Sequence, residues 1–264
     1  MAATAALVGM AIVKALILRA PGTNRDEGLA LAFSQAGAMA EIANVAEIMS
    51  GTRELADYQI LAIPGGFSYG DDLGVGKVQA NDFTRRIAIE AAPFVERGGL
   101  IMGVANGYNM LVKAGILPGP SGASQTATLT TNGSGRFECR WVYLGVNKQS
   151  RCVFTRGIEL IYAPFAHGEG KFFTAQDVLD KVDAALYYSD SAGVLSTVYP
   201  ACPSGSLRAI AGITDSTGRI FGLTALPEGN INYQQHPHWT RREAALAESG
   251  LKIFRNAVDW VKKS

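Results

Sequence analysis

The sequence has little cysteine, and the cysteines that it has are scattered. Cys139, Cys152 and Cys202 are the three cysteines among 264 residues. Their wide spacing provides neither a disulfide framework nor the spacing of metal ligands. We therefore expect a protein of the reducing cytoplasm with no metal centre. We also expect no cofactor, because the glycines at Gly65, Gly66 and Gly70 are not followed by the Gly-Lys-Ser/Thr of a phosphate loop.

The chain also lacks an excess of charge of one sign and an uninterrupted apolar segment. Its 24 Lys and Arg residues nearly balance its 23 Asp and Glu residues, and the basic residues are scattered. This pattern gives no electrostatic footprint for a nucleic acid. The apolar start has no preceding basic region and is interrupted by Lys14 and Arg19, so we expect neither a signal peptide nor a membrane span. Residues 1–11 are interpreted as an extension before the first strand.

Strand and helix patterns alternate in the first part of the chain. The whole chain is 48% hydrophobic. We predict a helix that begins with Asp26 and is capped by Thr23 or Asn24. The other predicted elements are strands at 13–18, 58–63 and 100–104, a strand with its connection at 42–48, and a helix at 83–95. This order indicates an α/β fold with a doubly wound, mainly parallel sheet flanked by helices. We expect one domain over residues 1–264.

The middle of the chain has a different pattern. Residues 126–153 alternate between apolar and polar side chains, which predicts an antiparallel β insertion at one edge of the sheet. Later strands are predicted at 186–188, 210–213 and 219–224. Residues 244–262 are expected to close the chain as an amphipathic helix.

A sharp turn is predicted where a buried strand meets a helix, at Gly103-Val104-Ala105-Asn106-Gly107. Flanking glycines let such a turn lift its central side chain out of the sheet and into the N-terminal field of the helix. The central residue is normally a serine or cysteine nucleophile, whereas here it is Ala105, whose methyl group cannot attack a carbonyl. We expect Ala105 to have a positive φ. A plain strand-to-helix turn is the alternative interpretation.

Four motifs then occur in a recognisable order: PGGFSYGDD at 64–72, the turn at 103–107, AHGEGKF at 166–172 and GLTALPE at 222–228. In this order they resemble the class I glutamine amidotransferases, and more narrowly the glutaminase subunits of phosphoribosylformylglycinamidine synthases of purine biosynthesis. The resemblance extends from residue 13 to residue 261.

This family hydrolyses glutamine: a cysteine thiolate attacks the side-chain amide, a histidine moves the proton, and a glutamate orients the histidine. The resemblance places these roles at Ala105, Leu226 and Glu228. It implies an oxyanion hole made by the backbone of Asn106 and of Gly66 or Phe67. Further substrate-binding positions implied by the resemblance are Gly65, Asn109, His167, Gly168 and Glu169. Residues 65–77 and 167–171 are expected to line one cleft.

The chain departs from the family where the chemistry takes place. Ala105 replaces the cysteine and Leu226 replaces the histidine, so Glu228 has no imidazole to orient. Further departures from the family pattern are Asn109, Gly229, Arg25 and Ser204, which replace a glutamine, an arginine, a frequent cysteine and an asparagine. We therefore expect no glutamine hydrolysis by this chain.

Three explanations stay open. In the first explanation, the chain is a natural glutaminase-type subunit that has lost its chemistry and docks on the ATP-dependent amidating synthetase subunit of the same pathway. Alternatively, it is an engineered, inactive variant of a working glutaminase subunit. In the third explanation it is a non-catalytic binding protein that has retained the pocket, with glutamine among its candidate ligands. The sequence does not decide whether glutamine still binds.

Two further groups could carry chemistry. His236-Pro237-His238 offers two imidazoles for a metal or a base, but a surface loop shaped by Pro237 is the favoured interpretation. Asp71 and Asp72 resemble a metal pair, but without a third ligand they are expected to be acids at a helix start. The segment 167–171 is interpreted as a loop that borders the glutamine pocket, and a glycine-rich hairpin turn is its alternative.

Overall fold

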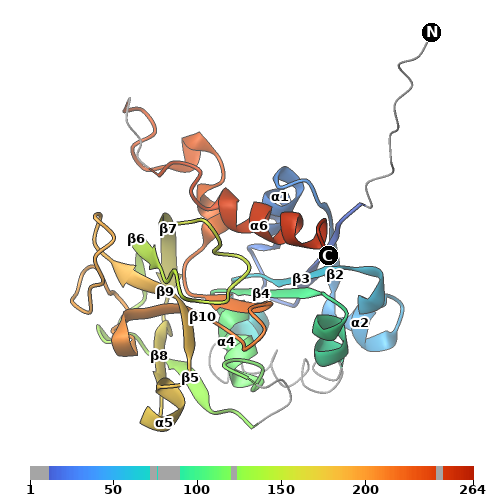
Figure 1. Ribbon diagram of the computed structural model, residues 1–264, viewed down its shortest axis with the longest axis horizontal. Helices are drawn as coiled ribbons and strands as arrows, with labels where there is room; N and C mark the ends of the chain where they lie inside the picture. The colour runs from blue at the N-terminus through green and yellow to red at the C-terminus, as the bar shows by residue number, and fades with distance from the viewer. Residues whose placement is uncertain (1–11, 72–75, 77–89, 120–123, 242–245) are drawn as a thin grey trace.

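A nine-stranded mixed sheet forms the centre of the molecule (Figure 1). The computed structural model describes residues 12–71, 76, 90–119, 124–241 and 246–264. The parallel half of the sheet contains, in spatial order, β2 (Met39–Asn44), β1 (Lys14–Arg19), β3 (Ile60–Ile63), β4 (Leu100–Val104) and β11 (Ile220–Leu223). The antiparallel half continues with β10 (Ile210–Thr214), β9 (Asp183–Ser189), β6 (Glu138–Val146) and β7 (Leu160–His167).

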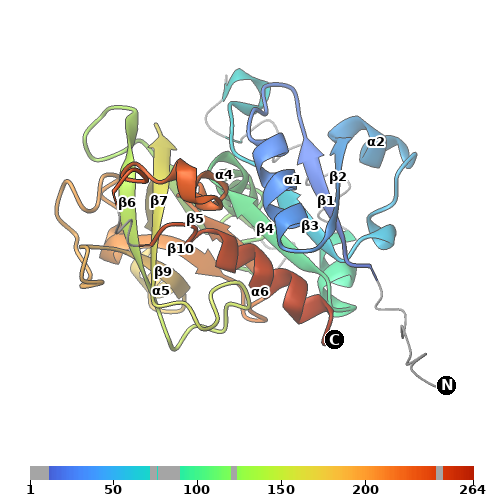
Figure 2. The same ribbon diagram turned by 90° about the horizontal axis from the view of Figure 1, so that it is seen from above.

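Helices cover both faces of the sheet (Figures 1 and 2). One face carries α1 (Asp26–Gln35) and α6 (Leu251–Val261), and the other carries α2 (Val45–Ser50), helical residues 90–96 and α4 (Asn106–Lys113). In β1, Ile17 packs on the face covered by α1 and α6, while its neighbours Leu16 and Leu18 pack on the face covered by α2 and α4. Successive strand side chains point to opposite faces, so an apolar run in a parallel strand fills two cores. The predicted α/β fold is confirmed.

A second, two-stranded sheet lies apart from the main one. It pairs β5 (Ala127–Thr130) with β8 (Lys171–Thr174) in antiparallel fashion, and the short helix α5 (Gln176–Leu179) follows. The prediction of antiparallel strands at one side of the sheet is confirmed, although β5 belongs to this separate pair. Pro164 lies in β7, at the open edge of the main sheet, where a residue without an N–H removes no ladder bond.

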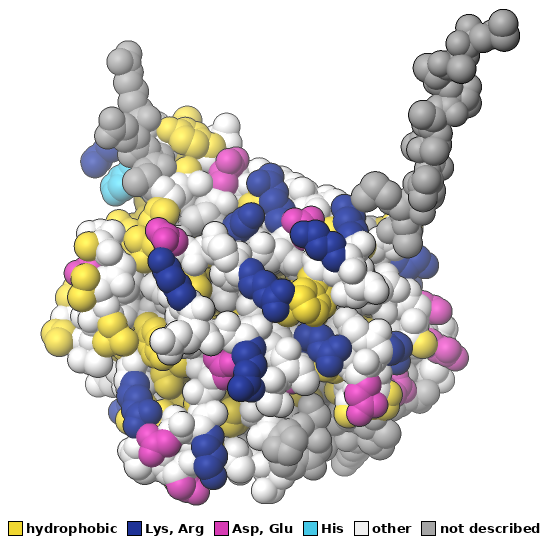
Figure 3. Space-filling model, viewed as in Figure 1, with side chains coloured by type: hydrophobic (Ala, Val, Ile, Leu, Met, Phe, Trp, Pro, Cys, Tyr) yellow, Lys and Arg dark blue, Asp and Glu magenta, His cyan; other side chains and the backbone are white. Residues whose placement is uncertain are grey.

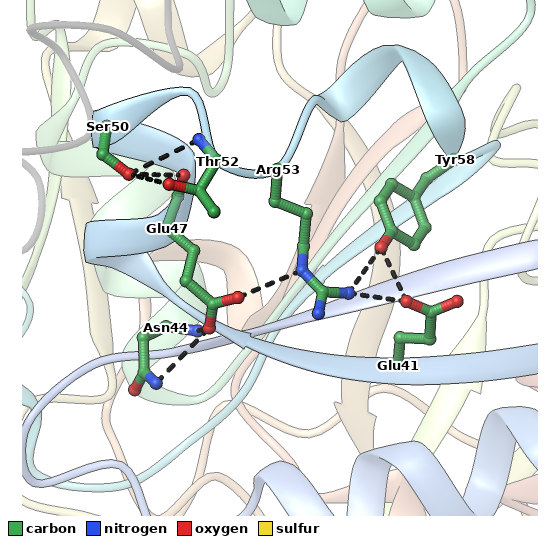
Figure 4. Close-up of polar contacts among 7 residues, drawn as sticks. All are labelled: Glu41, Asn44, Glu47, Ser50, Thr52, Arg53 and Tyr58. Atoms are coloured by element: carbon green, nitrogen blue, oxygen red, sulfur yellow. Dashed lines mark hydrogen bonds and ion pairs between the residues drawn. The ribbon is translucent and has the colours of Figure 1, made fainter.

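A polar network fastens α2 to the strands beside it (Figure 4). Arg53 donates to Glu47 (3.2 Å) and to the hydroxyl of Tyr58 (2.8 Å), and Tyr58 donates to Glu41 (2.8 Å). The hydrogen bond from Tyr58 holds the pKa of Glu41 below its usual value, because it stabilises the ionised carboxylate.

The strand predicted within 42–48 is confirmed at 42–44, but the connection that was expected after it is a helix. β2 ends at Asn44, and α2 begins at Val45. The backbone N–H of Asn44 donates to the side chain of Glu47 (2.9 Å), which is half of a capping box. The predicted caps of α1 are also wrong, because Arg25 occupies the N-cap position and makes no side-chain cap bond. The hydroxyl of Thr23 instead accepts from the backbone of Ala20 (3.1 Å).

The predicted closing helix is shorter than expected. α6 begins only at Leu251, because Leu246 and Glu248 have φ of 63° and 61°, which no α-helix accepts. Asn230 holds this turn, since it donates to the carbonyl of Leu246 (2.9 Å) and accepts from the N–H of Glu248 (3.0 Å). The predicted extension at 1–11 and most of the predicted helix at 83–95 lie outside the described residues, and residues 90–96 are helical.

Charges of both signs mix on the face shown in Figure 3, where Lys and Arg side chains lie among Asp and Glu. No helix in the described ranges has both the length and the apolarity that crossing a bilayer requires.

Candidate functional site

The turn between β4 and α4 has the predicted geometry. Ala105 has φ 51° and ψ −107°, its N–H donates to the carbonyl of Leu223 (2.9 Å), and its carbonyl accepts from the N–H of Asn109 (3.1 Å). A Cβ atom at Gly107 would lie 2.1 Å from the carbonyl oxygen of Ile63, so only glycine fits there. The expected positive φ of Ala105 is confirmed. A side chain at this position is held in a conformation that costs about 1–2 kcal/mol.

Ala105 and Leu226 come together beside Gly65. A Cβ atom built on Gly65 would lie 3.3 Å from Cβ of Ala105 and 3.3 Å from Cδ2 of Leu226. Leu226 precedes a short 3-10 turn, Pro227–Asn230, and its N–H donates to the carbonyl of Pro164 in β7 (2.8 Å). Two positions that are 121 residues apart in the sequence therefore share one point of the site. Both contribute only hydrocarbon to it.

Glu228 is a buried carboxyl group beneath α1. Among the described residues, neither of its oxygens has a hydrogen-bond partner. Burial raises the pKa of Glu228 to about 7, since desolvation disfavours the charged form. The backbone of Glu228 itself and, to a smaller extent, the positive charge of Arg25 partly oppose this effect. Its Cγ lies 3.4 Å from where a Cβ on Gly28 would be, which places it against the start of α1.

The two candidates for the oxyanion hole beside Asn106 are not equivalent. The N–H of Phe67 donates to the carbonyl of Gly22 (3.0 Å), so it is already engaged. Gly66 has φ 132°, a conformation that favours glycine, and its carbonyl accepts from the side chain of Asn106 (3.0 Å). The geometry therefore favours Gly66 over Phe67 as a backbone donor.

Asn109 and Glu169 contact each other. The side-chain amide of Asn109 donates to the carbonyl of Glu169 (3.2 Å), and Lys113 forms an ion pair with the Glu169 carboxylate (2.9 Å). Asn109 is fully buried. These contacts tie α4 to the segment 167–171 rather than presenting either side chain at the pocket.

His167 is the last residue of β7 and is buried, so the expected loop begins one residue later. Burial lowers the pKa of His167 to about 4, and interaction with the backbone of Ala105 partly opposes this. The imidazole is therefore neutral at physiological pH. Its contact with Ala105 brings the segment 167–171 to the turn, as expected.

Asn132 positions this segment, although its sequence context, Asn132-Gly133, is that of an ordinary turn. Its side chain donates to the carbonyl groups of Arg136 (2.9 Å) and His167 (2.6 Å) and accepts from the N–H of Gly170 (3.0 Å). Its backbone N–H donates to the carbonyl of Gly168 (3.0 Å). Nothing in the spacing of the sequence distinguishes such a buried asparagine from an ordinary turn residue.

Some of these residues surround one pocket, whereas Gly65, Asn109, Glu169 and Glu228 are not part of its lining. The residues that line it are Asn24, Arg25, Gly66, Phe67, Ala105, Asn106, Phe137, Ala166, His167, Gly168 and Leu226. Described parts of the segments 65–77 and 167–171 therefore line one cleft, as expected; residues 72–75 and 77 lie outside the described residues. Phe67 and Phe137 stack at 6.2 Å between ring centroids and are each about half exposed. The sequence pattern did not single out Phe137.

The remaining candidates lie elsewhere. His236 is buried, so the surface-loop interpretation is wrong for this residue; its ring packs against Trp141 (5.9 Å) and Tyr162 (5.4 Å). Asp72 lies outside the described residues. Within the described part of the chain, no three His, Cys, Asp or Glu side chains gather as metal ligands would.

The chain matches the family model of the CobB/CobQ-like glutamine amidotransferase domain over residues 12–261. It is 49% identical over 254 residues to the phosphoribosylformylglycinamidine synthase subunit PurQ of Dehalococcoides mccartyi, and the match covers 96% of this chain and 100% of that relative. The corresponding subunit of Pyrococcus furiosus is 34% identical over 254 residues, with 95% and 100% covered.

Solved structures agree with this fold. A chain of the "Structure of PurLQS from Thermotoga maritima" is 30% identical, covers 95% of this chain and 99% of its own length, and has a TM-score of 0.72. A glutamine amidotransferase from Thermotoga maritima, 14% identical with a TM-score of 0.56, covers 96% and 99% and supports the fold alone.

Proposed function

This chain belongs to the family of CobB/CobQ-like glutamine amidotransferase domains, and from that premise we propose that it is the glutaminase-type subunit of a phosphoribosylformylglycinamidine synthase in purine biosynthesis. The match to PurQ subunits over almost their full length supports this assignment. We further propose that, as it stands, the chain does not hydrolyse glutamine.

One observation carries the second part of the proposal. The strained turn that lifts a side chain into the pocket lifts a methyl group, and Leu226 meets Ala105 at the same point, 3.3 Å from the Cβ position of Gly65. Neither Ala105 nor Leu226 offers a nucleophile or a proton carrier at that point. Loss of either member of such a catalytic unit costs several orders of magnitude in rate.

The rest of the pocket supports descent from a working site. The backbone donors at Gly66 and Asn106 do not depend on side-chain identity, and Glu228 remains buried where it could orient an imidazole. The pocket has thus lost its two reactive side chains and kept its framework, a pattern that agrees with retention of the fold for a partner or a ligand.

The proposed partner is the ATP-dependent synthetase subunit of the same enzyme. The solved relative is part of an assembly named PurLQS, and this chain covers 99% of that relative. With no ammonia produced at Ala105, the synthetase would use free ammonia. We also propose that the chain is a single domain, because the sheet runs unbroken from β2 to β7. We further propose that it acts in the cytoplasm and without a cofactor.

The test is a synthetase assay on the purified chain combined with the synthetase subunit from the same source, with either glutamine or ammonium chloride as the nitrogen donor. We expect product with ammonium chloride and none above background with glutamine. Glutamine-dependent product, or glutamate release by the chain, would contradict the proposed loss of hydrolysis. Failure of the two proteins to associate would contradict the proposed partner.

A further inference from the structure

The pocket contains one unneutralised positive charge. Arg25 lines it and is exposed, and its guanidinium makes no ion pair or hydrogen bond with any residue that the structure describes. Within the described part of the chain, the lining residues include no Asp or Glu. A guanidinium in this situation offers several N–H donors to an anion and is suited to bidentate binding of a carboxylate.

Glu228 is the acid that acts on Arg25 electrostatically, and it does not cancel this charge. It lies within the electrostatic reach of Arg25 but forms no ion pair with it. Because burial raises the pKa of Glu228 to about 7, this carboxyl group holds a proton for much of the time at neutral pH. The pocket therefore has a net positive character.

The floor beside Arg25 is hydrocarbon. The Cβ position of Gly65 lies 3.6 Å from Cγ of Arg25 and 3.3 Å from both Cβ of Ala105 and Cδ2 of Leu226. The stem of the cation and the two apolar groups thus meet within a few ångströms. An amide on this floor would find donors for its oxygen at the backbone of Gly66 and Asn106, but its NH2 group would lie against hydrocarbon. An aliphatic group gains by burial there.

We propose that this pocket binds a small carboxylic acid with a short aliphatic chain, the carboxylate on Arg25 and the chain against Ala105 and Leu226. The inference rests on the proposed function in one respect, that the site does not hydrolyse what it binds. Arg25, Ala105 and Leu226 together favour an acid with an aliphatic chain over an amide.

The test is isothermal titration of the purified full chain with 4-methylpentanoate, its neutral amide 4-methylpentanamide, and L-glutamine. We expect saturable binding of 4-methylpentanoate and at least tenfold weaker binding of the amide and of glutamine. Arg25→Gln should weaken binding of the acid at least tenfold. Arg255→Gln, which removes an exposed arginine on α6, should leave it unchanged. Leu226→His should weaken binding of the acid, because it places a polar group on the hydrocarbon floor of the pocket.

Thermal melting of each variant verifies that it is folded. No saturable binding of the acid, equal binding of acid and amide, or an affinity unchanged by Arg25→Gln would each overturn the inference. The glutaminase assay separates the two proposals: glutamate release with intact, Arg25-dependent binding of the acid refutes only the loss of hydrolysis. Absence of both glutamate release and acid binding refutes only the ligand.

Discussion

Ala105 and Leu226 are 121 residues apart in the sequence and touch the same point in space, 3.3 Å from the Cβ position of Gly65. Ala105 is placed there by the turn after β4, and Leu226 by the turn after β11. β4 and β11 are neighbouring parallel strands, with Val104 opposite Leu223, so their carboxyl ends open at the same edge. Ligand sites of α/β sheets form at this edge.

Restoring the thiol alone should not restore hydrolysis. A cysteine with a pKa of about 8.5 is only a few per cent ionised at neutral pH, and without an imidazole at position 226 the departing ammonia lacks a proton donor. We expect Ala105→Cys to release glutamate at least tenfold more slowly than Ala105→Cys with Leu226→His. Leu226→His alone serves as the control without a nucleophile. Equal rates for the single and double cysteine variants would mean that Leu226 is not the base position.

Removing the methyl group of Ala105 should cost little stability. Glycine accepts φ 51°, so Ala105→Gly releases about 1–2 kcal/mol of backbone strain. This gain offsets the stability that an alanine-to-glycine change usually loses through the greater entropy of the unfolded chain and through removal of a buried methyl group. The matched control is Ala32→Gly, a buried alanine inside α1 without this strain. In urea unfolding, the loss of unfolding free energy should be about 1–2 kcal/mol smaller for Ala105→Gly than for the control. Equal losses in the two variants would show that the turn stores no strain.

Glu228→Gln should change how stability depends on pH. Because the pKa of Glu228 is about 7 in the folded protein and near its ordinary value of 4.5 when unfolded, the folded state holds the extra proton between these values. Its contribution to stability is therefore present at low pH and lost as pH rises from about 4.5 through 7. From pH 4.5 to pH 8, the stability of Glu228→Gln relative to the parent should rise by about 3 kcal/mol.

The comparison with the parent is needed because His167 acts in the opposite direction. Its pKa is about 4 when folded, so stability is lost as pH falls from about 6.5 toward 4, and this loss is common to both proteins. Glu159→Gln is the control, since Glu159 is an exposed acid paired with Lys148 on the surface. Urea unfolding at several pH values measures the difference. A difference that stays constant with pH would mean that Glu228 is ionised normally.

Asn132→Ala should loosen the segment that carries His167. The change removes three hydrogen bonds of a buried side chain and leaves the N–H of Gly170 without its partner, which should cost about 2–4 kcal/mol. Asn147→Ala is the control, because it removes two hydrogen bonds at a half-buried site. Amide hydrogen exchange at Gly170 should accelerate in Asn132→Ala alone. Unchanged exchange there would show that Asn132 does not hold the segment.

Local patterns predicted those features whose physical cause is local. The run from Leu100 to Val104 is apolar at every position and is followed by closely spaced glycines, so both the buried strand and the strained turn could be predicted. The prediction at 42–48 missed the helix that follows the strand, because a segment this short fits either element by its periodicity. The hydrogen bond from Asn44 to Glu47 decided in favour of a helix.

The sequence by itself determined the α/β class, the strained turn and the apolar side chains at Ala105 and Leu226, because these depend on residue type and on short-range spacing. Tertiary structure decided what depends on distant partners. The N–H of Phe67 donates to the carbonyl of Gly22 and is therefore not available to a ligand. Asn230 holds the turn after which α6 begins at Leu251. Asn132 holds the segment 167–171 by hydrogen bonds. Arg25 became a pocket residue only when the start of α1 met the ends of β4 and β11. The physical reason is that hydrogen bonds and burial between segments far apart in the chain leave no periodic trace in sequence.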